Sequence, residues 1–291
     1  MARKIPETRI KTQEIRRNSA YRKRNNLMEL INHLGLPLLQ FSHFKNIDGL
    51  VHGVTTRNGG VSEGPFFSLN LGTQTGDDPQ RVTCNRNKLL SHLNWDSPSV
   101  VIPNQVHGKN VVVITKERWG NDSSPLGVDG LTTKEKGILL MIKVADCIPV
   151  FLYDPASPAI SLIHAGWRGT ANGIIAQGVG AMSKSFGTKP KTIKAGIGPG
   201  IGRCCYEVKE DLREAFRKRK LDNSIWESDA DKKIFLDLKK AIFLELIKCR
   251  LNQDNIEVAS ECTSCNPDLF FSHRRDKGQT GRMAAVMGLV Q

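Results

Sequence analysis

Apolar residues in the middle of the chain fall into short β-branched runs separated by Gly, Pro or Asp, a pattern typical of buried strands. These runs predict strands over residues 100–103, 111–115, 130–133, 138–144, 150–153 and 159–164. Later runs predict strands over 192–197 and 257–260 and a final apolar segment over 282–290. Residues 37–76 hold short apolar pieces among turn-forming residues, which indicates loop-rich β structure.

Other parts of the chain have apolar residues at helical spacing. They predict helices over residues 27–36, 78–93, 169–186, 209–219 and 236–249. Gly35 and Pro37 are expected to end the first helix, and Gly187 the third. Because no internal repeat or Pro/Ser-rich linker follows residue 26, we predict one mixed α+β domain over residues 27–291.

Composition is that of a globular protein, with 39% hydrophobic and 24% charged residues, but 42 Lys and Arg against 29 Asp and Glu give a net charge of +13. Residues 1–26 hold nine basic and two acidic residues and so carry +7 of this charge. We expect this segment to be a flexible basic tail, with nucleic-acid binding by the tail as an alternative. If the charge of the remaining residues matters, we expect it to act through a few arginines that face phosphate.

Targeting signals are not evident in the sequence. No apolar run approaches the ~18 residues of a membrane span, and the N-terminus has no apolar signal-peptide region, so no membrane partner is expected. Seven cysteines, an odd number, favour reduced thiols. We therefore expect a cytoplasmic protein.

Three potential metal ligands follow predicted strands. His107 comes after the strand at 100–103, Cys147 ends the most apolar strand, and His164 ends the strand at 159–164. Side chains at strand ends can converge, and a His/Cys/His set suits Zn²⁺ with a fourth position open to water. The alternative is that each residue simply packs beside a buried strand.

The remaining cysteines and basic residues have simpler interpretations. The glycine-rich turn at 198–202 lacks the Lys-Ser/Thr of a phosphate loop and the spacing of a dinucleotide-binding motif. We expect Cys204 and Cys205, which follow it, to be a buried structural pair. Cys262 and Cys265 form a lone Cys-x-x-Cys, and a zinc ribbon needs a second pair. Residues 273–275, His-Arg-Arg, are expected to form a solvated basic turn.

Several motifs together resemble one known family. They are QVHG (105–108), ADCIP (145–149), HAGWRG (164–169), and GPGIG (198–202) followed by CCYEV (204–208). The similarity extends from TRNGGVS (56–62) and SLNLG (68–72) to FFSHRR (270–275) and TGR (280–282). These motifs resemble the laccase-domain purine nucleoside phosphorylase family of the YfiH/YlmD type, formerly labelled polyphenol oxidases.

The resemblance implies a mixed sandwich-like fold flanked by helices and one zinc ion held by His107, Cys147 and His164. It also implies phosphorolysis of adenosine, inosine and methylthioadenosine to base and ribose 1-phosphate, with adenosine deamination as a second reaction. A copper-dependent polyphenol oxidoreductase is the alternative, since these three residues could imitate a blue-copper site. A multicopper oxidase, however, needs many more than the seven histidines here. An oligomer is possible.

Phosphorolysis needs a phosphate site and proton transfer. Arg57, in a Gly-rich turn, is the first phosphate-binding and catalytic candidate. Arg168 is the second substrate-binding candidate, with a packing and salt-bridge role as the alternative. Asp129 is the acid/base candidate, and the alternative is a turn-forming Asp before Gly. Asp146, next to Cys147 at the expected substrate site, is expected to orient a ligand histidine.

Overall fold

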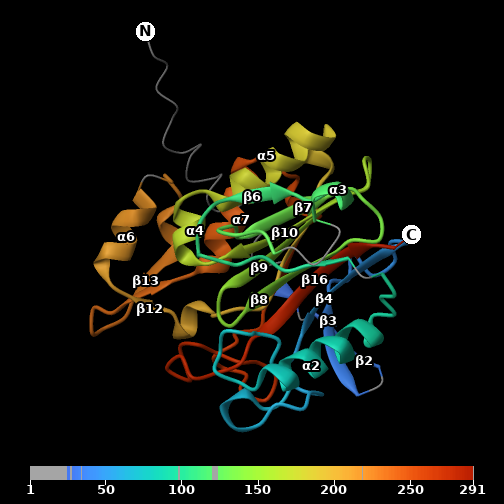
Figure 1. Cartoon of the computed structure of the whole chain (residues 1–291). Helices are drawn as coiled ribbons and strands as arrows, with labels where there is room; N and C mark the ends of the chain where they lie inside the picture. Colours follow the sequence, from blue (N-terminus) through green and yellow to red (C-terminus); the bar gives the residue numbers. More distant parts are fainter. Residues whose placement is uncertain are drawn as a thin grey trace.

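Two large β-sheets lie face to face, with helices on their outer sides (Figure 1). The computed structural model describes residues 25–26, 28–33, 35–97, 99–119, 124–217 and 219–290. Of the expected flexible tail, residues 1–24 lie outside the described residues, whereas β1 (Asn25–Asn26) pairs in parallel with Val258 and Ala259. The expectation of a single α+β domain with a sandwich-like core flanked by helices is confirmed.

Strand order places the middle of the chain at the centre of the seven-stranded sheet, whereas strands from near the two ends of the chain lie at the centre of the six-stranded sheet. The seven-stranded sheet runs β1, β15 (Ile256–Ala259), β11 (Lys194–Ile197), β9 (Ile148–Asp154), β10 (Ala159–Ala165), β7 (Gly130–Thr133), β6 (Val111–Val113). The six-stranded sheet runs β2 (Glu29–His33), β3 (Leu36–Gln40), β4 (Leu50–Thr55), β16 (Met283–Leu289), β8 (Leu139–Val144), β5 (Val100–Val101). A small third sheet runs β12 (Glu207–Val208), β14 (Ile234–Leu236), β13 (Trp226–Ser228).

Alternation along the central strands explains the layers. In β9, Phe151 and Tyr153 pack into the core between the two large sheets, whereas Val150 and Leu152 pack on the opposite face. That opposite face is covered by α4 (Trp167–Ala171), α5 (Ile174–Phe186), α6 (Glu210–Arg217) and α7 (Leu238–Lys248). On the other side, α2 (Pro79–His92) covers the six-stranded sheet through Leu89. Because both faces of each large sheet are covered, the strands read as continuous apolar runs.

The helix expected over residues 27–36 is wrong. This segment forms β2, which pairs antiparallel with β3 from Glu29 opposite Gln40 to His33 opposite Leu36. Gly35 has φ of +77°, a left-handed conformation that reverses the chain between the two strands and that glycine adopts without steric cost. A short apolar run of this kind is compatible with a helix or a strand. Here β3 pairs with β4, so its other edge is available for residues 29–33 to pair as a strand.

Two other predicted helices differ in their limits. The segment 169–186 is divided into α4 and α5 because Gly173 adopts φ of +87° between them. The segment 236–249 loses Leu236 to β14, and α7 begins after Asp237, whose carboxylate accepts the N–H of Lys240. The other predicted helices and strands agree with the structure within a few residues. The short helix α3 (Lys116–Trp119) and the small sheet of β12, β13 and β14 were not predicted.

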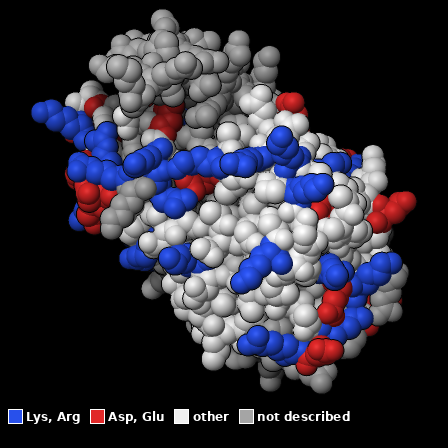
Figure 2. Space-filling model, turned by 90° about the horizontal axis from the view of Figure 1, so that it is seen from above, with Lys and Arg blue, Asp and Glu red and all other residues white. Residues whose placement is uncertain are grey.

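Basic side chains are distributed over the surface with acidic neighbours. Figure 2 shows a band of Lys and Arg side chains across the face seen from above, with Asp and Glu side chains at several places beside it. On α6, for example, Arg217 lies 2.8 Å from Glu214, and Arg213 lies 3.5 Å from Glu210. None of the helices in the described part of the chain has the length and apolar character to cross a membrane.

Candidate metal centre and substrate cavity

Three side chains that the sequence singled out meet at one end of the central strands. His107 lies between β5 and β6, Cys147 between β8 and β9, and His164 near the end of β10. Their ligand atoms all lie within 4.8 Å of one another. The antiparallel pairing of Ala165 with Ile148 explains this convergence, because it places the end of β10 beside the start of β9. The group has the donor set and closeness of a three-residue zinc site.

Asp129 forms hydrogen bonds with two of these residues, His107 and His164, from its buried position outside the cavity. Its carboxylate accepts the N–H groups of Val106, His107 and Gly108 at 3.2, 2.9 and 2.7 Å. The same carboxylate lies 2.8 Å from Nδ1 of His164, which leaves Nε2 as the available ligand atom. Burial alone would raise the pKa of Asp129, but the bonds from His164 and the turn outweigh it and lower that pKa.

The expected acid/base role of Asp129 does not agree with this geometry. The side chain is completely buried and does not line the cavity in front of the three residues. Its carboxylate is occupied by three backbone donors and one imidazole. Asp129 is therefore a positioning residue, because the turn it anchors and the ring it orients are those of the candidate ligands.

Asp146 does not orient a histidine, contrary to expectation. Its Oδ1 accepts the hydroxyl of Thr263 at 2.6 Å, and its Oδ2 accepts the N–H of Arg274 at 2.7 Å. It has φ of +83° in the turn that presents Cys147. Asp146 thus ties this turn to the segment near the C-terminus, although it also lines the cavity.

The thiol and the imidazoles form a strongly coupled group. Burial alone would raise the pKa of the Cys147 thiol, but His164 and His107 have the larger effect and lower this pKa to about 6. Burial lowers the pKa of His164, yet Cys147 and Asp129 raise it to about 9. Each charged form stabilises the other, so a thiolate is readily available for a cation at this position.

A cavity of about 490 Å³ opens in front of the three residues. Four cationic side chains and two large aromatic ones line it together with the candidate ligands. They are Lys143, Arg168, Arg274, Arg282, Trp167 and Tyr206. This volume lies within the usual range of ~300–1,000 Å³ for small-molecule sites, and the charges favour an anionic group.

Sequence reasoning missed three of these cations. Lys143 is the one charged residue within β8, and burial, Arg86 and Arg282 lower its pKa. Its interruption of an apolar strand was the signal that could have identified it. Arg282 and Arg274 belong to the family motifs TGR and FFSHRR. The turn expected at 273–275 is present, and His273 and Arg274 are exposed, but it also contributes to the cavity wall. Arg274 faces the cavity, and its guanidinium stacks 5.2 Å from the ring of Tyr206.

Of the two arginines predicted to bind substrate, Arg168 lines the cavity and Arg57 does not. Arg168 also lies over the ring of Trp167, at 4.8 Å from its centre. The guanidinium of Arg57 donates instead to the carbonyls of Phe67 and Pro267, at 2.8 and 3.1 Å, and covers Phe271. The expected phosphate-binding and catalytic role of Arg57 is therefore not supported, because two of its donors join two loops and the side chain does not line the cavity.

Comparison with known proteins gives consistent matches. Residues 51–290 match the family model described as multi-copper polyphenol oxidoreductase laccase. The chain is 41% identical over 247 residues to purine nucleoside phosphorylase YlmD of Geobacillus stearothermophilus, covering 82% of this chain and 90% of that one. It is 35% identical over 254 residues to a purine nucleoside phosphorylase of Bacteroides thetaiotaomicron, with 84% and 94% covered.

Solved structures agree in fold. The crystal structure of YlmD from Geobacillus stearothermophilus matches with a TM-score of 0.85 and 38% identity, covering 91% of this chain and 100% of that one. The structure of the hypothetical protein YfiH from Bacillus licheniformis matches with a TM-score of 0.82 and 35% identity, covering 89% and 98%.

Proposed function

Because this chain belongs to the family described as multi-copper polyphenol oxidoreductase laccase, whose relatives above are named purine nucleoside phosphorylases, we propose that it is a zinc-dependent purine nucleoside phosphorylase. The family resemblance predicted from the motifs is thereby confirmed. The proposed substrates are adenosine, inosine, methylthioadenosine and inorganic phosphate. The products are the base and ribose 1-phosphate, or 5-methylthioribose 1-phosphate where the substrate is methylthioadenosine. The observation that carries the proposal is a single cavity in which the candidate metal ligands and four cations face the same space.

His107, Cys147 and His164 would hold the zinc ion. Two imidazoles and a thiolate match its preference for nitrogen and sulfur, and the cavity leaves room for a fourth ligand. A bound zinc ion would supply a Lewis acid and lower the pKa of bound water. Asp129 would fix the His164 ring and the His107 turn.

Phosphate and nucleoside would bind to different parts of the cavity wall. Arg282 interacts electrostatically with Cys147, and Lys143 with Arg282, whereas Arg168 and Arg274 lie over the rings of Trp167 and Tyr206. Trp167 and Tyr206 supply flat apolar surface for a purine. Charge-assisted hydrogen bonds from these cations would hold phosphate where it can reach the ribose.

The copper oxidoreductase alternative is less well supported. Among the described residues, only the group of His107, Cys147 and His164 brings histidines together as potential ligands. His43 and His52 pack against Phe41 and Phe44 in the core. A multicopper centre needs more histidines in one place than this arrangement provides.

The experiment is to incubate the purified protein with each nucleoside, with and without phosphate, and to separate the products by chromatography. Free base and ribose 1-phosphate are expected only with phosphate, and adenosine without phosphate is expected to give inosine by the proposed second reaction. Cys147→Ala is expected to abolish turnover, whereas Cys84→Ala, at an exposed position on α2, serves as the matched control. Oxygen uptake with phenols by a copper-loaded protein that releases no base would contradict the proposal.

A further inference from the structure

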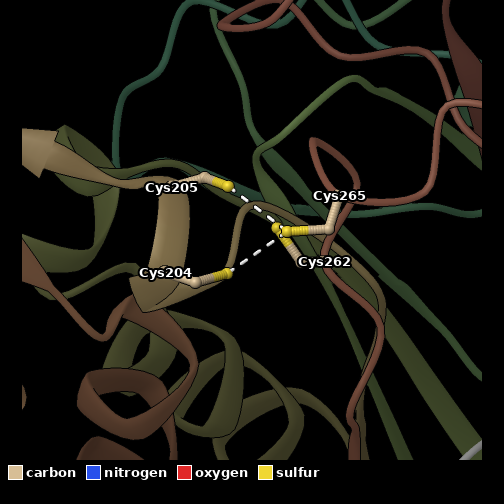
Figure 3. Close-up of side chains that lie close together, drawn as sticks. All are labelled: Cys204, Cys205, Cys262 and Cys265. Carbon is tan, nitrogen blue, oxygen red and sulfur yellow. Dashed lines mark hydrogen bonds between the residues drawn. The ribbon is translucent and has the colours of Figure 1, made fainter.

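Four cysteines from two distant segments meet outside the cavity. Cys204 and Cys205 belong to the short helix Arg203–Cys205, and Cys262 and Cys265 lie in a turn about 60 residues later. Figure 3 shows the four sulfur atoms pointing toward a common centre. The expected buried pair of Cys204 and Cys205 is therefore wrong, because Cys204 is exposed and both residues face the second pair.

The spacing of the four sulfur atoms suits a shared tetrahedral metal ion better than a disulfide. Sγ of Cys265 lies 3.5 Å from Sγ of Cys204 and 3.3 Å from Sγ of Cys205, and all four sulfurs lie within 4.8 Å of one another. A disulfide would need about 2.05 Å. A tetrahedral zinc ion with Zn–S bonds of about 2.3 Å would separate its sulfurs by roughly 3.8 Å, which lies inside the observed range.

We propose that Cys204, Cys205, Cys262 and Cys265 bind a second, structural Zn²⁺ ion, separate from the candidate centre in the cavity. Four thiolates fill every position of a tetrahedral zinc ion and leave none for substrate, so the role is to join the two segments. None of the four cysteines lines the cavity. Binding replaces four thiol protons, which pass to solvent, by one divalent cation, and needs no oxidant.

The surroundings of the sulfurs are suited to negative charge. The N–H of Gly202 donates to Sγ of Cys262 at 3.1 Å. Lys239 is buried nearby, and its ammonium donates to the carbonyls of Ala259 and Glu261, within the three residues before Cys262. A zinc ion with four thiolates carries a net charge of −2, and this buried cation and backbone donor would offset part of it.

Gly202 has no space for a side chain because of this group. A Cβ atom there would lie 3.0 Å from Cβ of Cys262 and 3.2 Å from Sγ of Cys204. The absence of a side chain thus lets the two cysteine pairs approach one another, which is what a shared ion requires.

The position of the site gives it a consequence for the cavity. Thr263, between the last two cysteines, donates to Asp146 beside Cys147, and its carbonyl accepts from Arg275 at 2.9 Å. Arg274, the residue directly before Arg275, lines the cavity. The second zinc ion would therefore fix the segment that carries part of the cavity wall.

The test is the metal content of the full chain, purified from zinc-supplemented medium and measured by mass spectrometry. We expect two zinc ions per chain in the wild type and one in Cys265→Ser. Cys84→Ser, the exposed control, is expected to retain two. His107→Ala is expected to lose the cavity ion and retain the other, so failure at one centre is distinguishable from failure at the other.

A second measurement does not depend on folding of the cysteine variants. His107→Ala loaded with Co²⁺ in place of zinc is expected to show the intense thiolate-to-cobalt absorption of a four-sulfur tetrahedral site. Equal zinc content in wild type and Cys265→Ser, a disulfide between the two segments, or iron in place of zinc would each overturn the proposal.

Discussion

Oδ1 of Asp129 lies 2.8 Å from Nδ1 of His164, and the same carboxylate accepts the backbone N–H of His107 at 2.9 Å. One buried anion thus orients two of the three candidate metal ligands, although it lies outside the cavity. The geometry places Asp129 where it positions the candidate metal ligands, not where it could transfer a proton directly to a molecule in the cavity.

Asp129→Asn tests this relationship. The amide keeps the volume but replaces one acceptor oxygen by an N–H₂ donor that opposes the N–H groups of the turn. Metal affinity is expected to fall by about 10- to 100-fold, as is typical for partners of ligating histidines. Competition with a chromophoric chelator measures it. Asp154→Asn, at the far end of β9 and equally buried, is the matched control and is expected to change stability only. Unchanged metal affinity in Asp129→Asn would refute the positioning role.

Gly166→Ala is expected to impair the metal centre by crowding. An added Cβ atom would lie 3.0 Å from Sγ of Cys147 and 3.2 Å from the ring of His107, both tighter than ordinary contacts. Metal content and turnover are expected to fall together. Gly180→Ala on α5 has open space around the new methyl group and is expected to stabilise the fold by about 0.5–1 kcal/mol. Thermal unfolding and metal analysis of both variants distinguish the two effects, and full metal occupancy in Gly166→Ala would contradict the geometry.

Lys143→Met tests the phosphate site. The variant keeps the length and the backbone pairing with Gln105 but removes the charge from the cavity wall. A charge-assisted hydrogen bond contributes about 1.5–3 kcal/mol, so kcat/KM for phosphate is expected to fall by about 10- to 100-fold. Steady-state kinetics with varied phosphate measures this change. Lys184→Met, at an exposed position in the last turn of α5, is the control, and equal kinetics in both variants would exclude Lys143 from phosphate binding.

Arg57→Met separates the sequence expectation from the structural one. The variant loses the bonds to the carbonyls of Phe67 and Pro267 and the contact with Phe271. The free energy of unfolding is expected to fall by about 1–3 kcal/mol, with no change in KM for phosphate. Denaturant unfolding and phosphate kinetics measure the two quantities. A large rise in KM without loss of stability would restore the phosphate-binding role.

Acid is expected to destabilise the fold through His52. Burial chiefly, together with the positive charge of His43, lowers the pKa of His52 to about 4, and the neutral ring accepts the N–H of Phe41 at 3.0 Å. The folded protein therefore binds this proton less readily than the unfolded chain. Stability is fully present above pH 6.5 and falls as pH decreases from 6.5 toward 4, by about 3 kcal/mol for this ring.

His52→Gln keeps an acceptor but cannot take up the proton. Its free energy of unfolding is expected to vary less between pH 6.5 and 4 than that of the wild type. Burial and Lys194 also lower the pKa of His43 to about 4. His43 therefore keeps its own contribution to the pH dependence of stability in this variant. Denaturant titrations across this range measure how the free energy of unfolding of each protein varies with pH. Equal variation in the two proteins would show that His52 has the same pKa in the folded and the unfolded chain.

The sequence by itself determined most elements and the identity of the candidate metal ligands. Strands such as β7 and β10 and the helix α2 are apparent from local apolar spacing. His107, Cys147 and His164 stood out because each follows a strand, and strand ends converge wherever the strands share a sheet edge. The strand identity of residues 29–33 was not apparent, because a short apolar run gains its meaning from the partner it pairs with.

Only the tertiary structure decided the roles of residues whose contacts are distant in sequence. Arg57 uses its donors on a loop 210 positions away, Asp129 reaches His164 across the β7–β10 pair, and Cys265 meets Cys204 across 61 positions. Hydrogen-bond donors, carboxylates and thiols are short-range groups whose chemistry depends on which atoms lie within about 3–4 Å. Local sequence patterns determine the helices and strands, but the packing of the two sheets determines which side chains lie close to one another.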